Sequence, residues 1–333
     1  MTEPEVAVVV VTYNSAEWIS RCLDALPAAL GDRRAHVVVV DNPATDDTAD
    51  VVAARHPDVT LLRNARNVGF AAAVNVGAAA SSAPWVLLLN PDTVPRPGSL
   101  ARLLEFAENH PGHGLYGGRT LAEDGTLEPT SAWGAPSVWS TVCFATGLSS
   151  FFPRSRVFDP ESLGRWQRDT VREVGIVTGC LLLADRGTWD RLRGMDERYF
   201  VYGEDADLSA RARRIGLRPV ITPDAEVVHA VGASSEEAGG NFALVFAGKV
   251  TYARTHFRGV AAGVVVWLLR AGVAWRATLE RVTHRGGNWS AGWACRDEWW
   301  DGFPPRESAQ PVAVGGARDV RARDIEGETD GRS

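Results

Sequence analysis

The residues with the clearest potential for chemistry stand where short apolar runs end. In "VLLLNPDT" (86–93), four aliphatic residues lead directly into Asn90 and Asp92. A carboxylate there suits a divalent cation on a diphosphate, because Mg²⁺ and Mn²⁺ prefer hard oxygen ligands and substrate phosphates usually complete their coordination. Pro91 and Asp92 are also common turn residues, so the tip alone fits either a ligand or a turn.

A second carboxylate, Asp41, follows the apolar run at 36–40. At the end of a strand it could accept hydrogen bonds from the base or ribose of a nucleotide. The alternative is an Asx turn, because "DNPATDDT" is rich in turn formers and Thr45 could cap the next helix.

The segment "NVGFAAAVNVG" (67–77) joins a sharp turn to a helix. Gly69 permits the turn, and the helix begins directly after it. Asn75 and Gly77 fall near the middle of that helix, where both residue types are unfavourable. A buried Asn75 would need a hydrogen-bond partner, whereas an Asn75 on the helix surface would not.

Acidic residues cluster in "FVYGEDADLSARARRIG" (200–216), where Glu204, Asp205 and Asp207 occupy the first turn of a predicted helix. Acids at the start of a helix, arginines at its end and a following glycine match the helix dipole and a helix stop, without any chemistry. Adjacent carboxylates also repel one another, which opposes the lowering of their pKa values by the helix N-terminus. A carboxylate that accepts a hydroxyl proton therefore fits as well.

His229 ends the apolar segment "AEVVH" and is followed by the loop-like "HAVGASS". The loop would leave the imidazole near the edge of a sheet. A lone histidine is more often structural than a ligand, so this residue needs a neighbour to give it a role.

These residues need elements that bring them together. Apolar runs at 6–11, 36–40, 59–62 and 85–89 alternate with helical patterns at about 16–29, 46–55, 70–80 and 98–109. Such alternation is typical of βαβ units, so we expect an α/β fold with a mostly parallel sheet and helices on both faces. Ligands bind at the carboxyl ends of such strands, which are polar in all four runs.

The rest of the chain is more varied. Residues 131–170 are aromatic and irregular, and we expect a long loop region with short helices. Residues 176–184 predict a strand, which is followed by a short helix near 186–193, a helix from about 204 to 215 and strands near 218–222 and 226–229. Residues 236–285 are helical in pattern, and the polar, Gly-rich residues from 304 onward predict a disordered tail.

Composition excludes several classes of protein. The chain has 333 residues and a net charge of −6, so it lacks the basic field that attracts nucleic acid. No GxGxxG follows the first strand, and no GxxxxGK[ST], GxSxG or HExxH is present. Four scattered cysteines indicate reduced, mostly buried thiols in a cytoplasmic protein. The N-terminus has no basic region before its apolar run and does not resemble a signal peptide.

The motifs gain specificity from their order. They are "VVVVTYNS", "VVVVDNPATDDT", "NVGFAAAVNVG", "LLLNPDT", "VTGCLLLADRGTWDRLRGMDERYFVYGEDADLSARARRIG" and "VVHAVGASS". Together they resemble the inverting family 2 glycosyltransferases with a GT-A fold, over roughly residues 5–260. The subgroup that they look like includes rhamnosyltransferases of cell-wall and surface-polysaccharide assembly.

The resemblance implies how a nucleotide-sugar donor would bind. Thr12 and Asp41 would hold the nucleotide base and ribose. Asn67, Gly69 and Asn75 would shape the nucleotide pocket. The donor would be a dTDP- or UDP-sugar, and rhamnose is the sugar expected for the subgroup.

The resemblance also implies a divalent cation, Mg²⁺ or Mn²⁺. Asn90, Pro91 and Asp92 occupy the place of the family's DxD motif, with Asn90 as a neutral contact to the donor and Asp92 as the metal-binding member. His229 would be a further ligand of the metal or of the diphosphate. Two departures stand out: Asn90 replaces the first acid of the motif, and Pro43 and Ala44 alter the loop after Asp41.

The same resemblance assigns the chemistry to the acidic cluster. Asp205 would be the general base, and Glu204 and Asp207 would orient the acceptor or the base. Asp205 would take the proton of an acceptor hydroxyl as that oxygen attacks the anomeric carbon, which inverts the centre without a covalent sugar intermediate. The acceptor would be a cell-wall or surface glycan, free or polyprenyl-linked. The alternative is an inactive nucleotide-sugar-binding or scaffold protein, which Asn90 favours.

A stripe of apolar residues near the C-terminus indicates a surface helix. The stripe comprises Val264, Leu268, Ala271, Trp275, Leu279 and Val282, and arginines lie off it. This pattern suits a helix on the inner face of the membrane, or a helix packed on the domain or on a second subunit. The uncharged run within it, 260–269, is too short to span a bilayer, which needs ~20 residues.

We therefore expect three regions in the chain. Residues 1–235 would form the GT-A domain, with a donor half at 1–120 and an acceptor and catalytic half at 121–235. Residues 236–303 would form a helical region with a membrane contact, and residues 304–333 the tail.

Overall fold

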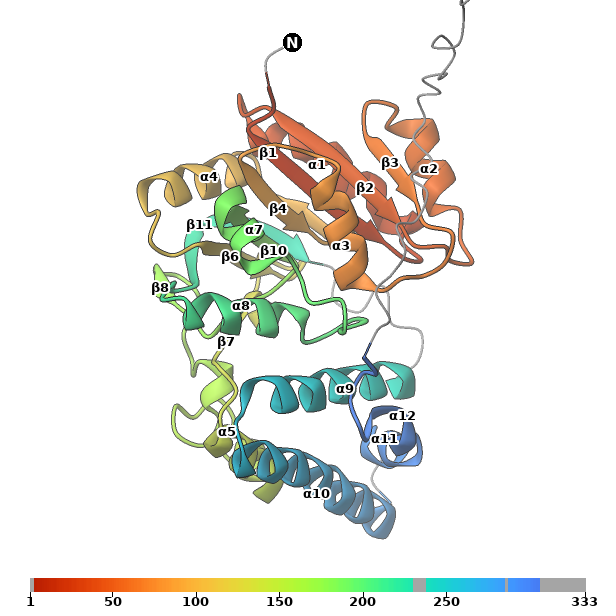
Figure 1. Cartoon of the computed structure of the whole chain (residues 1–333), viewed down its shortest axis with the longest axis vertical. Helices are drawn as coiled ribbons and strands as arrows, with labels where there is room; N and C mark the ends of the chain where they lie inside the picture. Colours follow the sequence, from red (N-terminus) through yellow and green to blue (C-terminus); the bar gives the residue numbers. More distant parts are fainter. Residues whose placement is uncertain (1–2, 230–237, 285–286, 306–333) are drawn as a thin grey trace, which may run out of the picture.

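The computed structural model describes residues 3–229, 238–284 and 287–305. A nine-stranded sheet lies beside a group of C-terminal helices (Figure 1). The strands of this sheet are β1 (Val6–Thr12), β2 (Ala35–Asp41), β3 (Thr60–Arg63), β4 (Trp85–Leu89), β5 (Thr93–Pro95), β6 (Leu115–Leu121), β8 (Arg172–Glu173), β10 (Leu181–Asp185) and β11 (Val220–His229). They follow the order β3-β2-β1-β4-β10-β6-β11-β5, and β8 pairs with β11.

The first four strands form the parallel half that the alternating pattern predicts. β1 pairs in parallel with β2 and β4, and β2 pairs in parallel with β3. The carboxyl ends of these strands lie along one edge, where Thr12 faces Asp41 and Asp41 faces Arg63. The accompanying helices, close to their predicted bounds, are α1 (Ala16–Leu30), α2 (Thr48–Arg55), α3 (Phe70–Ala79) and α4 (Ser99–Asn109).

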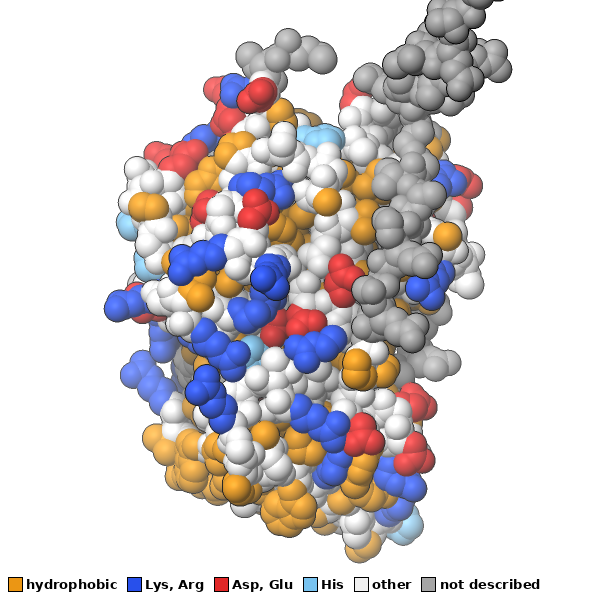
Figure 2. All heavy atoms as spheres, viewed as in Figure 1, with side chains coloured by type: hydrophobic (Ala, Val, Ile, Leu, Met, Phe, Trp, Pro, Cys, Tyr) orange, Lys and Arg blue, Asp and Glu red, His pale blue; other side chains and the backbone are white. Residues whose placement is uncertain are grey.

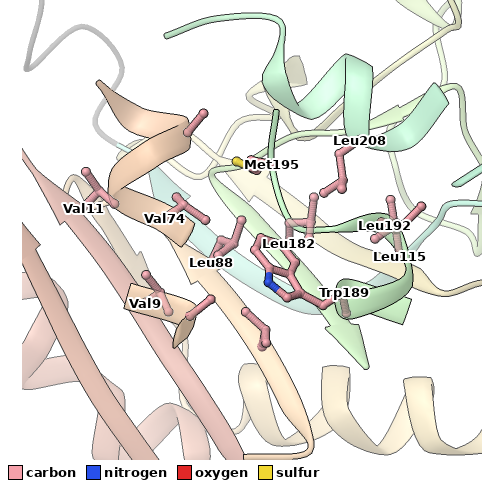
Figure 3. Close-up of a cluster of buried hydrophobic side chains, with 14 of the residues drawn as sticks. Val9, Val11, Val74, Leu88, Leu115, Leu182, Trp189, Leu192, Met195 and Leu208 are labelled. Atoms are coloured by element: carbon pink, nitrogen blue, oxygen red, sulfur yellow. The ribbon is translucent and has the colours of Figure 1, made fainter. Parts of the chain in front are cut away.

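Side-chain alternation divides the core between the two faces of the sheet. Val8 and Val10 of β1 face the layer made by α1, α2 and α4. Val9 and Val11 face the opposite layer, where α3, α7 (Arg186–Leu192) and α8 (Glu204–Arg214) pack (Figure 3). Because both faces are covered, the strands are apolar almost throughout, which is typical of parallel sheets.

Two strand predictions in the second half are wrong in detail. Residues 176–184 are not one strand, because β9 (Ile176–Val177) pairs with β7 (Ala132–Trp133) in a separate sheet, and only β10 joins the main one. The two strands expected near 218–222 and 226–229 are a single strand, β11. Its pairing with β6 shifts between Ile221 and Glu226, where Pro223 removes a backbone donor.

The aromatic region 131–170 contains the short helices that its pattern predicts. These are α5 (Val138–Thr146) and α6 (Leu148–Phe151), with 3₁₀ turns at Pro129–Ser131 and Pro160–Ser162. α5 begins with a capping box between Ser137 and Ser140, and it ends at Gly147 with a φ of 83°. The region is therefore folded, and α5 packs against the C-terminal helices.

The C-terminal helices share a core of their own, below the sheet in Figure 1. α10 contacts α5 closely: Gly272 lies against the Phe144 ring, and the Trp275 indole donates to the Ala145 carbonyl at 2.5 Å. Of the expected tail, residues 306–333 lie outside the described residues. The helices are α9 (Ala238–His256), α10 (Val260–Thr283), α11 (Trp289–Ala294) and α12 (Arg296–Trp299).

The length argument against a membrane span is wrong for α10. The helix continues past Leu269 to Thr283, and its 24 residues, with a mean hydropathy of 1.4 over an 18-residue window, are by length and composition long and apolar enough to cross a membrane. Its inner face is packed in the protein, with Val265, Leu269 and Val273 buried. Part of the predicted stripe, including Trp275, is exposed.

Candidate active site

The ends of β1 and β2 are joined by a buried hydrogen bond. The Thr12 hydroxyl donates to Asp41 Oδ1 at 2.7 Å, and both residues are buried. Burial raises the pKa of Asp41, and the hydrogen bond from Thr12 opposes that rise. The carboxylate therefore has one fixed partner and one oxygen left for a ligand at the strand ends.

Two asparagines that the sequence reasoning did not single out tie this edge together. Asn42 Oδ1 accepts from Asn64 Nδ2 at 3.0 Å and from the Val68 amide at 3.2 Å. These bonds connect the end of β2 to the loop before α3. Asn42 and Asn64 both lie in the polar strand ends, and this position was their only sequence signal.

Asn67 and Gly69 form the turn that carries the chain into α3. Asn67 Oδ1 accepts the Gly69 amide at 2.9 Å, and Gly69 has a φ of 83°. A Cβ on Gly69 would meet the Phe200 carbonyl oxygen at 2.4 Å, and the Phe70 amide donates to that oxygen at 2.6 Å. This turn therefore holds the donor half against the segment that leads to the acidic cluster.

Asn75 is held by the loop that leads toward the acidic cluster. Its Oδ1 accepts the Met195 amide and its Nδ2 donates to the Met195 carbonyl, both at 2.9 Å. Glu197 Oε1 also accepts from Nδ2, at 3.1 Å. Because the amide group is bonded to this loop, Asn75 positions residues 195–197, and its expected part in shaping the nucleotide pocket stays a prediction.

The tip at Asn90–Asp92 meets His229 through strand pairing. β5 directly follows the tip and pairs with β11 so that Thr93 lies opposite His229. His229 Nε2 lies 3.4 Å from Asp92 Oδ1, and His229 Nδ1 lies 3.7 Å from Glu128 Oε2. Glu128 is an acid that sequence reasoning missed, because nothing in "TLEPTS" marks it as different from a loop carboxylate.

This acidic pair controls the charge of the histidine. Burial lowers the pKa of His229, but the attraction of its ring N–H groups to the Asp92 and Glu128 carboxylates outweighs that effect and raises the pKa to about 9. Asp92 Oδ1 and His229 Nδ1 are buried without a hydrogen-bond partner. Two carboxylates beside a ring nitrogen without a hydrogen-bond partner fit a divalent cation, which would bind the neutral imidazole and so release the proton that His229 carries in its absence.

The protein groups alone would not complete the coordination. Within the described ranges, no three His, Cys, Asp or Glu side chains form a metal-binding group. That arrangement suits a cation shared with phosphates, since Mg²⁺ is commonly held by one or two carboxylates plus substrate phosphates.

A tight turn between β9 and β10 links this tip to the acidic cluster. The Asn90 amide donates to the Cys180 carbonyl at 3.1 Å. The backbone of neighbouring Gly179 hydrogen-bonds the Asp205 carboxylate. Cys180 itself is buried, and burial raises its pKa to about 12, so it stays a neutral thiol beside these carboxylates. The turn places Asp92 and Asp205 on two sides of one small region.

The carboxyls of Glu204 and Asp205 lie in a poorly solvated place. Burial raises the pKa of both, and repulsion from Asp205 raises the pKa of Glu204 further, to about 8. Glu204 Oε2 has no hydrogen-bond partner. Near neutral pH the two carboxyls therefore hold a proton. This state suits a site in which Asp205 is ionised and can accept a proton, while Glu204 stays protonated.

This pKa shift predicts a pH-dependent stability. Protonated Glu204 contributes stability that is complete below its ordinary pKa of 4.5 and is lost as pH rises to about 8. Glu204→Gln removes this titration. As the pH rises from 4.5 to about 8, the melting temperature of the variant should therefore rise relative to that of the wild type, and above this range the difference should stay constant. In the free energy of unfolding, the upper limit of this relative stabilisation of the variant is about 5 kcal/mol. Thermal unfolding across pH measures it, and an equal difference at every pH would contradict the assignment.

Asp207 is buried away from any acceptor, so of its two expected roles only the orientation of the base stays a prediction. It is fully buried, and Arg211 Nε donates to its Oδ2 at 2.7 Å. His256 Nε2 lies 2.6 Å from its Oδ1. Arg211 also donates to the Gly194 carbonyl at 3.0 Å. Asp207 therefore joins α8 to α9 and to the loop that Asn75 holds.

A cavity of about 480 Å³ opens beside Glu204 and Asp205. It lies between the sheet domain and the C-terminal helices, and aromatic residues such as Trp133, Phe144 and Tyr252 line it. α9 closes it tightly at Gly248, where a Cβ would meet the Tyr202 carbonyl oxygen at 2.1 Å. The lining of the cavity is mostly apolar, and Glu204 and Asp205 are among its acidic residues.

Comparison with known sequences gives relatives of one kind. Residues 7–165 match the family model described as glycosyl transferase family 2. An N-acetylglucosaminyl-diphospho-decaprenol L-rhamnosyltransferase of Mycobacterium tuberculosis is 35% identical over 236 residues, 67% of this chain and 75% of the relative. A succinoglycan biosynthesis protein of Rhizobium meliloti is 39% identical over 106 residues, 32% of this chain and 30% of that protein.

Solved structures share the fold. A mannosyltransferase of Pyrobaculum calidifontis in complex with GDP-Man and Mn²⁺ superposes with a TM-score of 0.53 at 21% identity, covering 89% of this chain and 80% of that one. GalNAc-T7 with UDP, GalNAc and Mn²⁺ gives 0.51 at 15% identity, covering 75% and 50%. With the strand-end site and the sequence relatives, this likeness leads to one conclusion: the chain belongs to glycosyl transferase family 2 and is a glycosyltransferase with a GT-A fold.

Proposed function

We propose that the enzyme transfers L-rhamnose from a dTDP donor, with inversion, to a sugar hydroxyl on a polyprenyl-diphosphate-linked acceptor. The observation that carries this proposal is the position of Asp205, between the strand-end edge and a mostly apolar cavity. The name of the mycobacterial relative supports the sugar and the lipid-linked acceptor. A UDP-hexose donor and an unlinked glycan acceptor are the competing choices.

The donor binds across the carboxyl ends of β1, β2 and β4. Asp41, fixed by Thr12, accepts hydrogen bonds from the base or ribose of the nucleotide. Asn67 and Gly69 hold the loop that closes one side of this pocket. Asn90 contacts the diphosphate end as a neutral group, because it carries no charge to offer a cation.

Asp92 and His229 hold a divalent cation, with Glu128 beside them. When bound, the cation supplies electrostatic assistance to the departing diphosphate. The Mn²⁺ in the structures of the two fold relatives supports this choice of cofactor.

The acceptor enters the cavity with its hydroxyl at Asp205. The ionised Asp205 accepts the hydroxyl proton as the oxygen bonds to the anomeric carbon and the bond to the diphosphate breaks. Attack opposite the leaving group inverts that carbon. Glu204 keeps its proton near neutral pH and can donate a hydrogen bond to the acceptor.

We propose three regions with separate tasks. Residues 1–120 bind the donor, 121–235 supply the base and the near wall of the acceptor cavity, and 236–303 supply its far wall. Val245, Lys249 and Leu269 belong to that far wall. With a lipid-linked acceptor, the protein works at the inner face of the cytoplasmic membrane.

A thermal-shift panel of donors tests the proposal. We expect dTDP-rhamnose to raise the melting temperature more than UDP-glucose or UDP-N-acetylglucosamine does, and Mn²⁺ to increase the shift, because ligands that bind only the folded state stabilise it. EDTA should remove the increase. Stabilisation by UDP-sugars alone would overturn the donor assignment, and identical shifts with Mn²⁺ and with EDTA would overturn the cation.

A further inference from the structure

A pocket lined by arginines lies apart from the active site. Arg154, Arg156, Arg165 and Arg172 form its walls, together with Trp166 and Thr170. Within the described part of the chain, no carboxylate lies within 4.0 Å of these four guanidinium groups. Four acids belong to the same segment: Glu161 lines the acceptor cavity, Asp159 lines it too and accepts the Arg154 backbone amide at 2.8 Å, Glu173 pairs with Arg218, and Asp169 is exposed. The pocket therefore carries unbalanced positive charge.

A fifth arginine, Arg168, adds to the positive charge of this region. Arg168 is buried, and it donates to the Trp166 carbonyl at 2.7 Å and to the Pro129 and Ala132 carbonyls at 3.3 Å. Burial lowers the pKa of its guanidinium, and the charges of Arg172 and Arg154 lower it further. A buried cation that is repelled by its neighbours favours an incoming anion.

Trp166 orders one wall of the pocket. The Arg172 guanidinium lies 4.8 Å from the centre of the indole ring, and that of Arg168 lies 5.3 Å from it. Arg168 Nη1 and Nη2 already donate to carbonyl oxygens, so Arg172 is the member of this pair that can turn N–H groups to an acceptor while its guanidinium stays over the ring. Arginines held in this way suit phosphate oxygens, which accept two parallel hydrogen bonds.

Exposed apolar side chains continue from the pocket. Phe151 is 77% exposed, Phe152 51% and Val157 57%, and they flank Arg154 and Arg156 in the sequence. Figure 2 shows hydrophobic side chains gathered on this end of the molecule, with Lys and Arg side chains above them.

These side chains form one connected surface. The Trp139 indole donates to the Val157 carbonyl at 2.7 Å, and the rings of Trp139 and Phe152 both contact Phe158. The rings of Phe151 and Trp275 both lie within 4 Å of the position that a Cβ on Gly147 would take. We call this surface the apolar rim; it comprises Trp139, Phe151, Phe152, Val157 and Trp275.

We propose that the arginine pocket and the apolar rim form one docking site for an anionic phospholipid bilayer. The arginines bind lipid phosphates, and the rim enters the boundary between headgroups and acyl chains. Charge complementarity favours a bilayer, because cations next to exposed aromatic rings are the pattern of interfacial binding. Only the biological purpose of the docking site rests on the proposed function, because docking here would bring the acceptor cavity to a lipid-linked substrate.

Vesicle co-sedimentation of the full-length protein tests this site. The wild type should bind vesicles of phosphatidylcholine with phosphatidylglycerol and stay in solution with phosphatidylcholine alone. The double variant Arg156→Gln/Arg165→Gln removes two exposed pocket arginines, and its binding should weaken roughly 5-fold for each arginine. Phe151→Ser should also weaken binding. The matched control Arg55→Gln/Arg191→Gln, with exposed arginines of the sheet domain, should bind as the wild type does.

Three results would overturn the proposal. The first is a wild type that stays in solution with anionic vesicles. The second is a pocket variant that binds vesicles no worse than the matched control does. The third is release of the bound protein by inorganic phosphate at equal ionic strength, which would indicate a site for free phosphate. Donor thermal shifts measured on the same samples keep the two hypotheses separate, because donor binding does not depend on this surface. A normal donor shift without vesicle binding contradicts only the docking site.

Discussion

Asp205→Asn should lower kcat by about 10²- to 10⁴-fold and leave donor binding unchanged, because the loss is that of a positioned general base. Asparagine keeps the oxygen that accepts the Ala206 amide at 2.7 Å, so the start of α8 should stay intact. It cannot accept the hydroxyl proton of the acceptor. Turnover of a lipid-linked or soluble acceptor and the thermal shift with the donor measure the two effects separately.

The matched control is Asp190→Asn, which makes the same change at an exposed carboxylate of α7. It should behave as the wild type in both assays. A fully active Asp205→Asn enzyme would show that another group accepts the proton. A wild type that binds the donor but turns over no acceptor, with a variant indistinguishable from it, would favour the nucleotide-sugar-binding alternative that Asn90 raised.

The donor half was predictable because its signals are local. Apolar runs such as 6–11 are continuous since both sheet faces are covered, and parallel strands place their carboxyl ends together by geometry alone. Thr12 and Asp41 therefore came out at one edge without any knowledge of contacts. The order of the motifs predicted the family, and the family match and the sequence relatives confirm that prediction.

The second half was less predictable because its contacts are long-range. Glu128 lies beside His229 only because of how β6, β5 and β11 pair, and no sequence pattern reports that pairing. Asp207 has the same sequence surroundings as Asp205, yet it points toward Arg211 and His256, 49 residues away in the second case. Neighbours on a helix face different directions, so a run of acids does not say which of them meets the substrate.

The arginine pocket escaped prediction for a related reason. Its arginines are spread over residues 154–172, and the irregular backbone of that segment gives them no period. The C-terminal stripe drew attention to α10 instead, yet Trp275 is the member of that stripe that meets the α5–α6 region. A membrane surface made from two distant segments has no continuous pattern in the sequence.

Asp92→Asn should abolish the Mn²⁺-dependent part of donor binding and lower kcat/KM by at least about 100-fold. Loss of a residue that only supports a metal ligand lowers metal affinity or activity by about 10- to 100-fold. Loss of a direct ligand should cost at least as much, which sets the lower limit. Asp92 is placed to contact the cation directly, because its Oδ1 makes no hydrogen bond in the described structure and its nearest charged neighbour is His229 Nε2 at 3.4 Å. Titration of Mn²⁺ in the presence of the nucleoside diphosphate, followed by thermal shift, measures the affinity.

The tip supplies its own matched variant, because Asn90 stands two residues before Asp92. Asn90→Asp adds a second carboxylate to the same strand end, and we expect it to strengthen Mn²⁺ binding in the absence of donor, since a second anionic oxygen ligand adds attraction for the cation. If Asp92→Asn weakens donor binding equally with Mn²⁺ and with EDTA, Asp92 contacts the donor itself and not a cation. If Asp92→Asn leaves the Mn²⁺ effect intact, the cation is held elsewhere, and Glu128 and His229 become the residues to change next.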